Sequence, residues 1–271
     1  MSALEAIVLG LVQGLTEFLP ISSSGHLRIV PALLGWPDPG AGFTAVIQLG
    51  TMAAVLIYFR DDLWRIAIAW LRELRVPIRR ASQEAKLGWF IVLGTIPISI
   101  FGFVFSDQIE SGARSLYLIG SALILFSFVM LLAERVGTQR RDLTEMNGRD
   151  GLFVGMAQAL ALIPGVSRSG ATISAGLLRG FDRVAAARYS FLLSVPAVVL
   201  SGLFELRKIG EDGGASVGAT AIATLAAFVS GYLAIAWLLR YLSTHTLGIF
   251  IVYRVALGAL VLTLAATGTI S

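Results

Sequence analysis

Long stretches without formal charge constrain this chain more than any other feature. Four of them, nearly or wholly free of charged side chains, cover residues 39–59, 87–106, 115–133 and 213–240. Of the 271 residues 56% are hydrophobic and only 14% are charged, whereas a soluble domain usually carries about a quarter charged residues. A soluble fold would leave too much apolar surface in water. The sequence therefore predicts an integral membrane protein.

Six apolar stretches are long enough, or nearly so, to cross a hydrocarbon core about 30 Å thick as helices. They lie near residues 43–59, 87–105, 116–133, 187–206, 216–239 and 247–267. Two further apolar regions, 4–35 and 151–180, are interrupted by the turn-rich runs LPISSSGH and IPGVSRSGAT. Irregular backbone at membrane depth is tolerated only where protein or a water-filled cavity satisfies it. Each region is therefore expected to be a re-entrant helical hairpin that lines a site.

Lysine and arginine residues gather in two connections, and this pattern predicts the topology. Residues 60–86 carry seven and residues 134–149 carry four, so both connections are expected in the cytoplasm, with the 106–115 and 207–215 turns outside. The net charge of +4 is therefore explained by basic residues that set the orientation of the protein in the membrane. For this reason no nucleic-acid partner is expected. The basic residues that suit contact with anionic lipid headgroups are Arg72, Arg75, Arg79 and Arg80.

A weak internal repeat relates the two halves at an offset of 145 residues. Three spans follow each hairpin, and because three is odd the second copy is inverted relative to the first. The sequence predicts an all-α polytopic membrane protein, one domain over 1–271, with repeats at about 1–135 and 150–271 joined by the connection 134–149. The matched residues are Gly10, Gln13, Leu15, Ser22, Ser24 and Gly25 with Gly155, Gln158, Leu160, Ser167, Ser169 and Gly170.

The first hairpin combines an acid, hydroxyl groups and an imidazole. Gln13 and Glu17 are four residues apart and share one helical face, and Pro20 ends that half-helix. The run that follows offers hydroxyls and free backbone N–H groups to a phosphate or another anion. Ionisable groups inside a membrane are functional by default. The candidate residues in this turn are Ser22, Ser23, Ser24, Gly25 and His26.

The second hairpin contributes a guanidinium. Arg168 presents a planar fork of donors that matches phosphate oxygens in pairs. Gly165 and Gly170 allow close approach of the backbone to a ligand, and Thr172 adds a hydroxyl. Arg254, isolated in the last apolar stretch, is either a second phosphate clamp or a structural partner. The hydroxyls that flank the guanidinium in sequence belong to Ser167 and Ser169.

Both hairpins resemble the undecaprenyl pyrophosphate phosphatase family, bacterial membrane enzymes associated with bacitracin resistance. Its signatures are an (E/Q)xxxE segment that runs into a Ser-rich turn and a His, and a PGxSRSxxT segment. Here they fall at residues 13–26 and 164–172, and the resemblance covers essentially the whole chain. The family positions matched here are Glu17, Ser23, His26, Ser167, Arg168, Ser169 and Thr172, and Arg254 resembles a further arginine of the last span.

The resemblance implies hydrolysis of the terminal phosphate of undecaprenyl diphosphate, which regenerates the lipid carrier for cell-wall precursors. It also implies a divalent cation, Mg²⁺ or Ca²⁺, and a place in the bacterial cytoplasmic (inner) membrane. The outward start of the first hairpin favours a site that opens to the periplasmic side. Gln13 stands where many members have Glu, which leaves Glu17 as the candidate metal ligand.

In the mechanism expected from these residues, Arg168 holds the diphosphate and Ser23 attacks the terminal phosphorus. His26 or Glu17 takes the proton, and Glu17 alternatively holds the cation. The sequence does not separate the roles of these two residues.

Two other readings fit parts of the sequence. A secondary transporter or flippase for an anionic polyprenyl phosphate lipid would use the same inverted repeat and anion site. The type-2 phosphatidic acid phosphatases share a similar turn and an SR pair, but Ser174 stands where they would have a second catalytic His. The oligomeric state stays open, with a homodimer as one option.

Overall fold

The computed structural model describes residues 1–105, 115–205 and 216–270, and side chains are described except at 41 and 200–205. Within this part the chain is helical apart from its turns and one isolated bridge between Arg141 and Phe181. The all-α prediction is confirmed. The 106–115 and 207–215 turns, expected to face outward, lie outside the described residues except for Ser115.

In chain order the described helices are α1 (Ala3–Phe18), α2 (Ser23–Leu34), α3 (Gly40–Tyr58), α4 (Arg60–Arg72), α5 (Gln83–Val104), α7 (Leu116–Val136), η1 (Leu143–Glu145), α8 (Gly148–Ala159), η2 (Leu160–Leu162), α9 (Arg168–Leu178), α10 (Arg183–Glu205), α11 (Val217–Leu242) and α12 (Gly248–Ala266).

The six predicted spans correspond to α3, α5, α7, α10, α11 and α12. Four of the described helices, α5, α7, α11 and α12, are each long and apolar enough to cross a membrane. The pair α3 and α4, bent by 76° at their junction, brings the number of candidate spans to as many as five. Helix α4, inside the basic connection 60–86, was not predicted from the sequence.

Both interrupted apolar regions are broken into helix pairs, as predicted. In each pair the first helix begins with a capping box, formed by Ser2 and Glu5 in α1 and by Asn147 and Asp150 in α8. These two boxes lie 145 residues apart, so the repeat seen in the sequence extends to the way the helices start.

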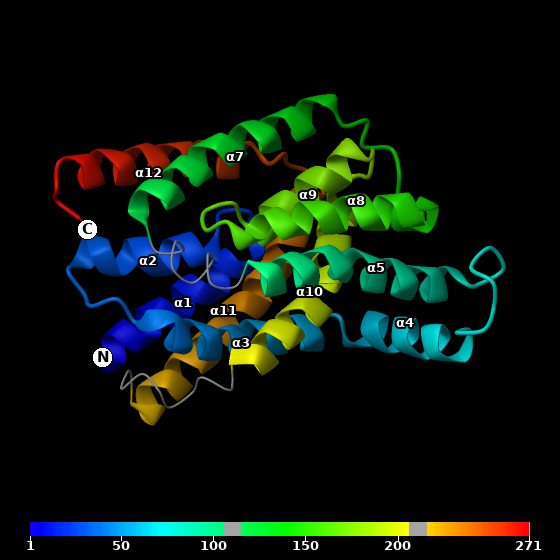
Figure 1. The fold of residues 1–271 in the computed structure, drawn as a ribbon, viewed down its shortest axis with the longest axis horizontal. Helices are drawn as coiled ribbons and strands as arrows, with labels where there is room; N and C mark the ends of the chain where they lie inside the picture. The colour runs from blue at the N-terminus through cyan, green and yellow to red at the C-terminus, as the bar shows by residue number, and fades with distance from the viewer. Residues whose placement is uncertain (106–114, 206–215, 271) are drawn as a thin grey trace.

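The first helix of each pair packs against a long helix from the other half of the chain. Figure 1 shows α1 crossing α11 and α8 lying beside α5, while α7 and α12 run side by side along one edge. Glycines permit the close crossings. A Cβ added to Gly10 would lie 2.2 Å from the Ala223 carbonyl oxygen, and one added to Gly155 would lie 2.4 Å from that of Gly94. The turns that follow α1 and α8 are thereby held inside the bundle.

A buried acid secures the second pair. Asp150, at the start of α8, is fully buried and accepts hydrogen bonds from Arg141 at 2.7 Å and Arg179 at 2.6 Å. The bond to Asp150 raises the pKa of Arg141 above its usual range, so that guanidinium stays charged. The connection before α8 and the end of α9 are therefore fastened to the same carboxylate.

Candidate active site

Glu17, near the end of α1, is the point at which the two hairpins meet. Its Oε1 accepts a hydrogen bond from Nη2 of Arg168 at 2.8 Å, and its Oε2 accepts one from Oγ of Ser23 at 2.6 Å. Nε2 of Gln13, one turn earlier, donates to Oε2 at 3.1 Å. The structure thus brings together four residues that the sequence singled out, Gln13, Glu17, Ser23 and Arg168, called the Glu17 cluster below.

Two helix N-termini meet at the Glu17 cluster. Ser23 is the first residue of α2 and Arg168 is the first residue of α9. Free N–H groups and the positive end of the helix dipole favour an anion at such positions. Nη1 of Arg168 is buried and has no hydrogen-bond partner among the described residues. The cluster therefore combines a hydroxyl group, a carboxylate and a guanidinium with one unsatisfied donor.

The turns that lead into α2 and α9 are built alike. Ser22 and Ser167 cap the two helices and adopt φ values of 75° and 77°, which are uncommon for residues other than glycine. Their hydroxyls accept the backbone N–H groups of Gly25 and Gly170 at 3.3 and 3.1 Å. These four residues shape the turns, and their predicted contacts with substrate stay predictions.

Ser24 and Ser169 occupy matching places, and each hydroxyl lies near that of the capping serine, but only Ser169 also bonds to the other hairpin. Ser24 is exposed and its hydroxyl lies 3.3 Å from that of Ser22. Ser169 is buried, and its hydroxyl donates to the Leu19 carbonyl of the first turn at 3.0 Å. Ser169 therefore ties the second hairpin to the first.

His26 is close to Ser23 in sequence but is bonded elsewhere. Its Nδ1 lies 2.8 Å from the Ser22 carbonyl, and because a carbonyl oxygen only accepts, this nitrogen carries the proton. Its Nε2 lies 2.7 Å from the Tyr253 hydroxyl. The hydroxyl of Ser23 donates to Glu17, so the geometry favours Glu17 as its proton acceptor.

Arg254, on α12, connects the turns of the two hairpins by hydrogen bonds. Its fully buried guanidinium donates to the Pro20 carbonyl at 3.2 Å, the Gly165 carbonyl at 2.9 Å and the Ser127 hydroxyl at 3.2 Å. Because each of its nitrogens is bonded within the protein, the structure favours the second of its two predicted roles, the structural partner, over a phosphate clamp.

Replacing Arg254 by Met should lower the unfolding temperature in detergent by about 5 °C or more, since the Pro20 and Gly165 carbonyls would be buried without donors. The matched control is Ser127→Ala, which removes only one of the three bonds and should cost less. Equal unfolding temperatures for wild type and Arg254→Met, followed by differential scanning fluorimetry, would contradict the bracing role.

Two more predicted residues turn out to organise the backbone. Gly165 adopts a φ of +95°, and an added Cβ would lie 2.7 Å from the Ile119 carbonyl oxygen, so glycine is required there. The buried hydroxyl of Thr172, expected to face a phosphate, instead donates to the Arg168 carbonyl at 2.8 Å and lies 2.6 Å from Ser190 Oγ. It fastens α9 to α10.

Three polar residues around the site were not predicted from the sequence. Thr51 accepts a long hydrogen bond from Gln13 at 3.4 Å, and Ser127 accepts one from Arg254. Tyr253 forms a hydrogen bond with His26, and the two rings are stacked. Each is a polar residue within an apolar helix, which is a weak signal. Their partners are 38, 127 and 227 positions away.

Comparison with known proteins identifies the family. The model of the bacitracin resistance protein BacA family matches residues 6–260. The chain belongs to the BacA family. Its relatives include undecaprenyl-diphosphatases of Nocardioides sp., 55% identical with 99% of this chain and 98% of the relative covered, and of Thermobifida fusca, 53% identical with 100% and 93% covered. A third, from Myxococcus xanthus, is 54% identical with 100% and 92% covered. The family assignment thus agrees with the resemblance carried by the two hairpin motifs.

Proposed function

We propose that this BacA-family chain hydrolyses undecaprenyl diphosphate to undecaprenyl phosphate and inorganic phosphate, and so recycles the lipid carrier of cell-wall synthesis. The observation that carries the proposal is the shared carboxylate: Ser23 and Arg168, on different hairpins, both bond to Glu17. The full-length relatives named undecaprenyl-diphosphatase support the choice of substrate.

In the proposed reaction the terminal phosphate replaces Glu17 as the partner of Arg168. The guanidinium, with its unsatisfied Nη1, then binds two phosphate oxygens. Ser23 Oγ forms a bond to the terminal phosphorus as the bridging P–O bond breaks and undecaprenyl phosphate leaves. Glu17 accepts the serine proton and passes it to the departing undecaprenyl phosphate, which restores the carboxylate. The carboxylate next deprotonates a water that attacks the phosphoserine, and as the bond from phosphorus to Ser23 Oγ breaks, that oxygen regains the proton and inorganic phosphate leaves. The helix N-termini of α2 and α9 stabilise the charge of the transferring group.

The topology is part of this proposal. Six spans and two re-entrant hairpins would form an inverted repeat, about 1–135 and 150–271, within one domain of the bacterial inner membrane. The connection 134–149 would be cytoplasmic and the site would open to the periplasm. The matching caps at Ser22 and Ser167 and the reciprocal packing of α1 on α11 and of α8 on α5 support the repeat. A homodimer is compatible with this arrangement.

The donor set does not by itself form a resident metal site. Among the described residues no group of three or more His, Asp or Glu side chains is placed to hold a metal ion, and both oxygens of Glu17 already have protein partners. Mg²⁺ commonly binds through one or two carboxylates together with substrate phosphates. A divalent cation, Mg²⁺ or Ca²⁺, would therefore arrive with the diphosphate. Oε1 of Glu17, released when Arg168 binds the phosphate, would supply one ligand, and Oε2 would stay with Ser23 as the proton acceptor.

Gln13→Glu should lower the Mg²⁺ concentration for half-maximal activity by about tenfold, because affinity rises with the number of charged ligands. The new carboxylate would share a helical face with Glu17. The measurement is phosphate release over a Mg²⁺ titration, with Gln13→Ala as the control that adds no charge. The same half-maximal concentration in wild type and Gln13→Glu would show that this face does not hold the cation.

The decisive experiment is phosphate release from undecaprenyl diphosphate by the purified chain in detergent. Detergent provides no second compartment, so turnover there separates the phosphatase from a transporter or flippase of anionic polyprenyl phosphate. Release of one phosphate per lipid is the expected result. Binding of the lipid without release, in the presence of Mg²⁺ or Ca²⁺, would overturn the proposal and favour the transporter.

A further inference from the structure

Helix α4 exposes apolar side chains although it is too polar to be a span. Its 13 residues include three Arg and two Asp, yet Trp64 is 69% exposed and Leu71 is 58% exposed. These two residues are seven positions apart and so lie on one side of the helix, while Ile66 is buried on the side that packs into the protein. An exposed Trp beside charged residues is typical of the membrane–water interface.

The end of α4 and the segment that follows it carry positive charges that no acidic side chain of the described residues pairs with. The arginines of α4 that have acidic partners are Arg60, with Asp61, and Arg65, with Asp62. The only acid in residues 72–80 is Glu73, and its carboxylate accepts the backbone N–H of Ser82 at 2.7 Å. Four exposed guanidinium groups have no acidic partner among the described residues, and they belong to Arg72, Arg75, Arg79 and Arg80.

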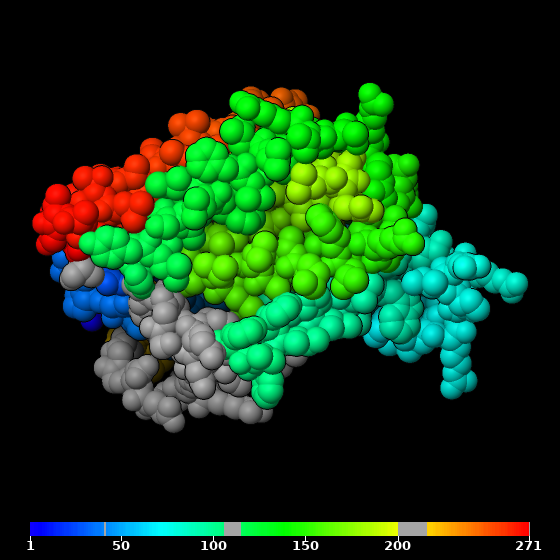
Figure 2. All heavy atoms as spheres, turned by 45° about the horizontal axis from the view of Figure 1, so that its top comes forward, coloured from blue at the N-terminus to red at the C-terminus, as the bar shows by residue number. Residues whose placement is uncertain are grey.

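The direction of α4 places this surface at the level of lipid headgroups. A single residue, Phe59, separates α4 from α3, and the two axes are bent by 76°. If α3 crosses the bilayer, α4 therefore runs close to the plane of its surface. Figure 2 shows this part of the chain, coloured cyan, at one end of the molecule with long side chains that extend outward.

We propose that residues 60–80 form a binding surface for anionic phospholipid headgroups in the leaflet at that end of α3. Trp64 and Leu71 lie at the boundary of the acyl chains, and the four unpaired arginines bind the headgroup phosphates. The charge and the apolar residues lie together on a continuation of a predicted span, which is why we favour lipid over an acidic protein. This surface is separate from the Glu17 cluster, and its role does not depend on the reaction.

The test uses quenching of Trp64 by brominated lipids in the full-length protein. The chain is reconstituted in vesicles of equal parts phosphatidylglycerol and phosphatidylcholine, with bromine on one lipid or the other. The signal of Trp64 is the difference between wild type and Trp64→Phe. Brominated phosphatidylglycerol should quench this signal about twofold more than brominated phosphatidylcholine, because the arginines enrich the anionic lipid nearby.

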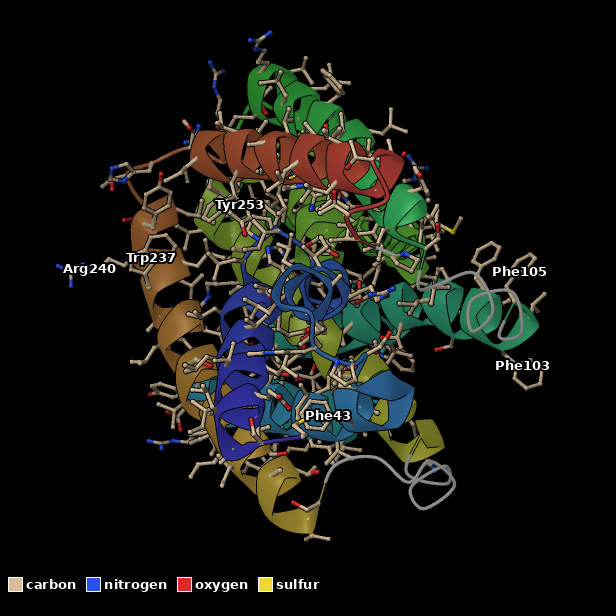
Figure 3. The ribbon with its side chains drawn as sticks, turned by 90° about the vertical axis from the view of Figure 1, so that its left-hand side faces the viewer. Phe43, Phe103, Phe105, Trp237, Arg240 and Tyr253 are labelled. Carbon is tan, nitrogen blue, oxygen red and sulfur yellow. The ribbon has the colours of Figure 1, made fainter. Side chains whose placement is uncertain are left out.

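The matched variants separate these arginines from positive charge in general. Combined Arg72→Gln, Arg75→Gln, Arg79→Gln and Arg80→Gln should bring the quenching ratio to one while phosphate release persists. Arg240→Gln, on α11 where Figure 3 shows the side chain extending away from the protein, should leave the ratio unchanged. Equal quenching by the two lipids in wild type, or quenching by neither, would overturn the proposal. So would an unchanged ratio in the fourfold variant.

Discussion

Ser23→Ala should reduce phosphate release from undecaprenyl diphosphate by at least about 1,000-fold, because loss of a nucleophile leaves only the binding and electrostatic parts of catalysis. The hydroxyl donates to Glu17 at 2.6 Å, so it is placed to lose its proton as it attacks. Acid quenching with substrate labelled on its terminal phosphate should trap a labelled protein in wild type and none in Ser23→Ala.

Ser24→Ala is the matched control for this result. Ser24 lies next in the chain and is exposed, and its hydroxyl contacts only that of Ser22 within the described residues. A far smaller loss than in Ser23→Ala is expected, because Ser24 would supply at most one hydrogen bond to the substrate. Full activity of Ser23→Ala would eliminate Ser23 as the nucleophile and promote His26, the other nucleophilic side chain of the turn.

Arg168→Lys should lower kcat/KM by about 100-fold or more, since arginines that stabilise a transferring phosphoryl group are commonly worth at least this much. An ammonium could still pair with Glu17, but it lacks the fork that binds two phosphate oxygens. The buried and unsatisfied Nη1 is the second arm of that fork. Steady-state kinetics with the purified variant in detergent measure the effect.

A second arginine provides the control for charge alone. Arg188 pairs with Asp62 at 2.6 Å on a partly exposed part of α10, where a lysine can make the same ion pair. Arg188→Lys should therefore keep nearly all activity. If Arg168→Lys kept as much activity as Arg188→Lys, Arg168 would act only as a positive charge, and its fork of donors would not be needed.

Local sequence was sufficient to predict the helix breaks and the residues at their turns. Pro20 and the Ser-rich run end one half-helix, and the run from Pro164 to Ser169 ends the other. Capping and turn formation depend on residues a few positions apart, so the sequence carries their signal directly. The positions of α5, α7, α11 and α12 followed from apolar length in the same way.

The exposed face of α4 was not predictable in this way. Its charges marked residues 60–86 as a connection between spans, and short helices rich in charge leave no span-length apolar signal. Whether Trp64 faces lipid or protein depends on which side of α4 packs on the rest of the molecule.

By itself the sequence determined an all-helical membrane protein with two broken segments that carry a serine, an acid and an arginine. The tertiary structure alone decided which groups meet: Glu17 with Arg168 across 151 positions, His26 with Tyr253 rather than Ser23, and Arg254 with the carbonyls of both turns. The physical reason is that each of these bonds depends on how helices far apart in the sequence pack. Periodicity and turn chemistry describe neighbours along the chain and do not encode that packing.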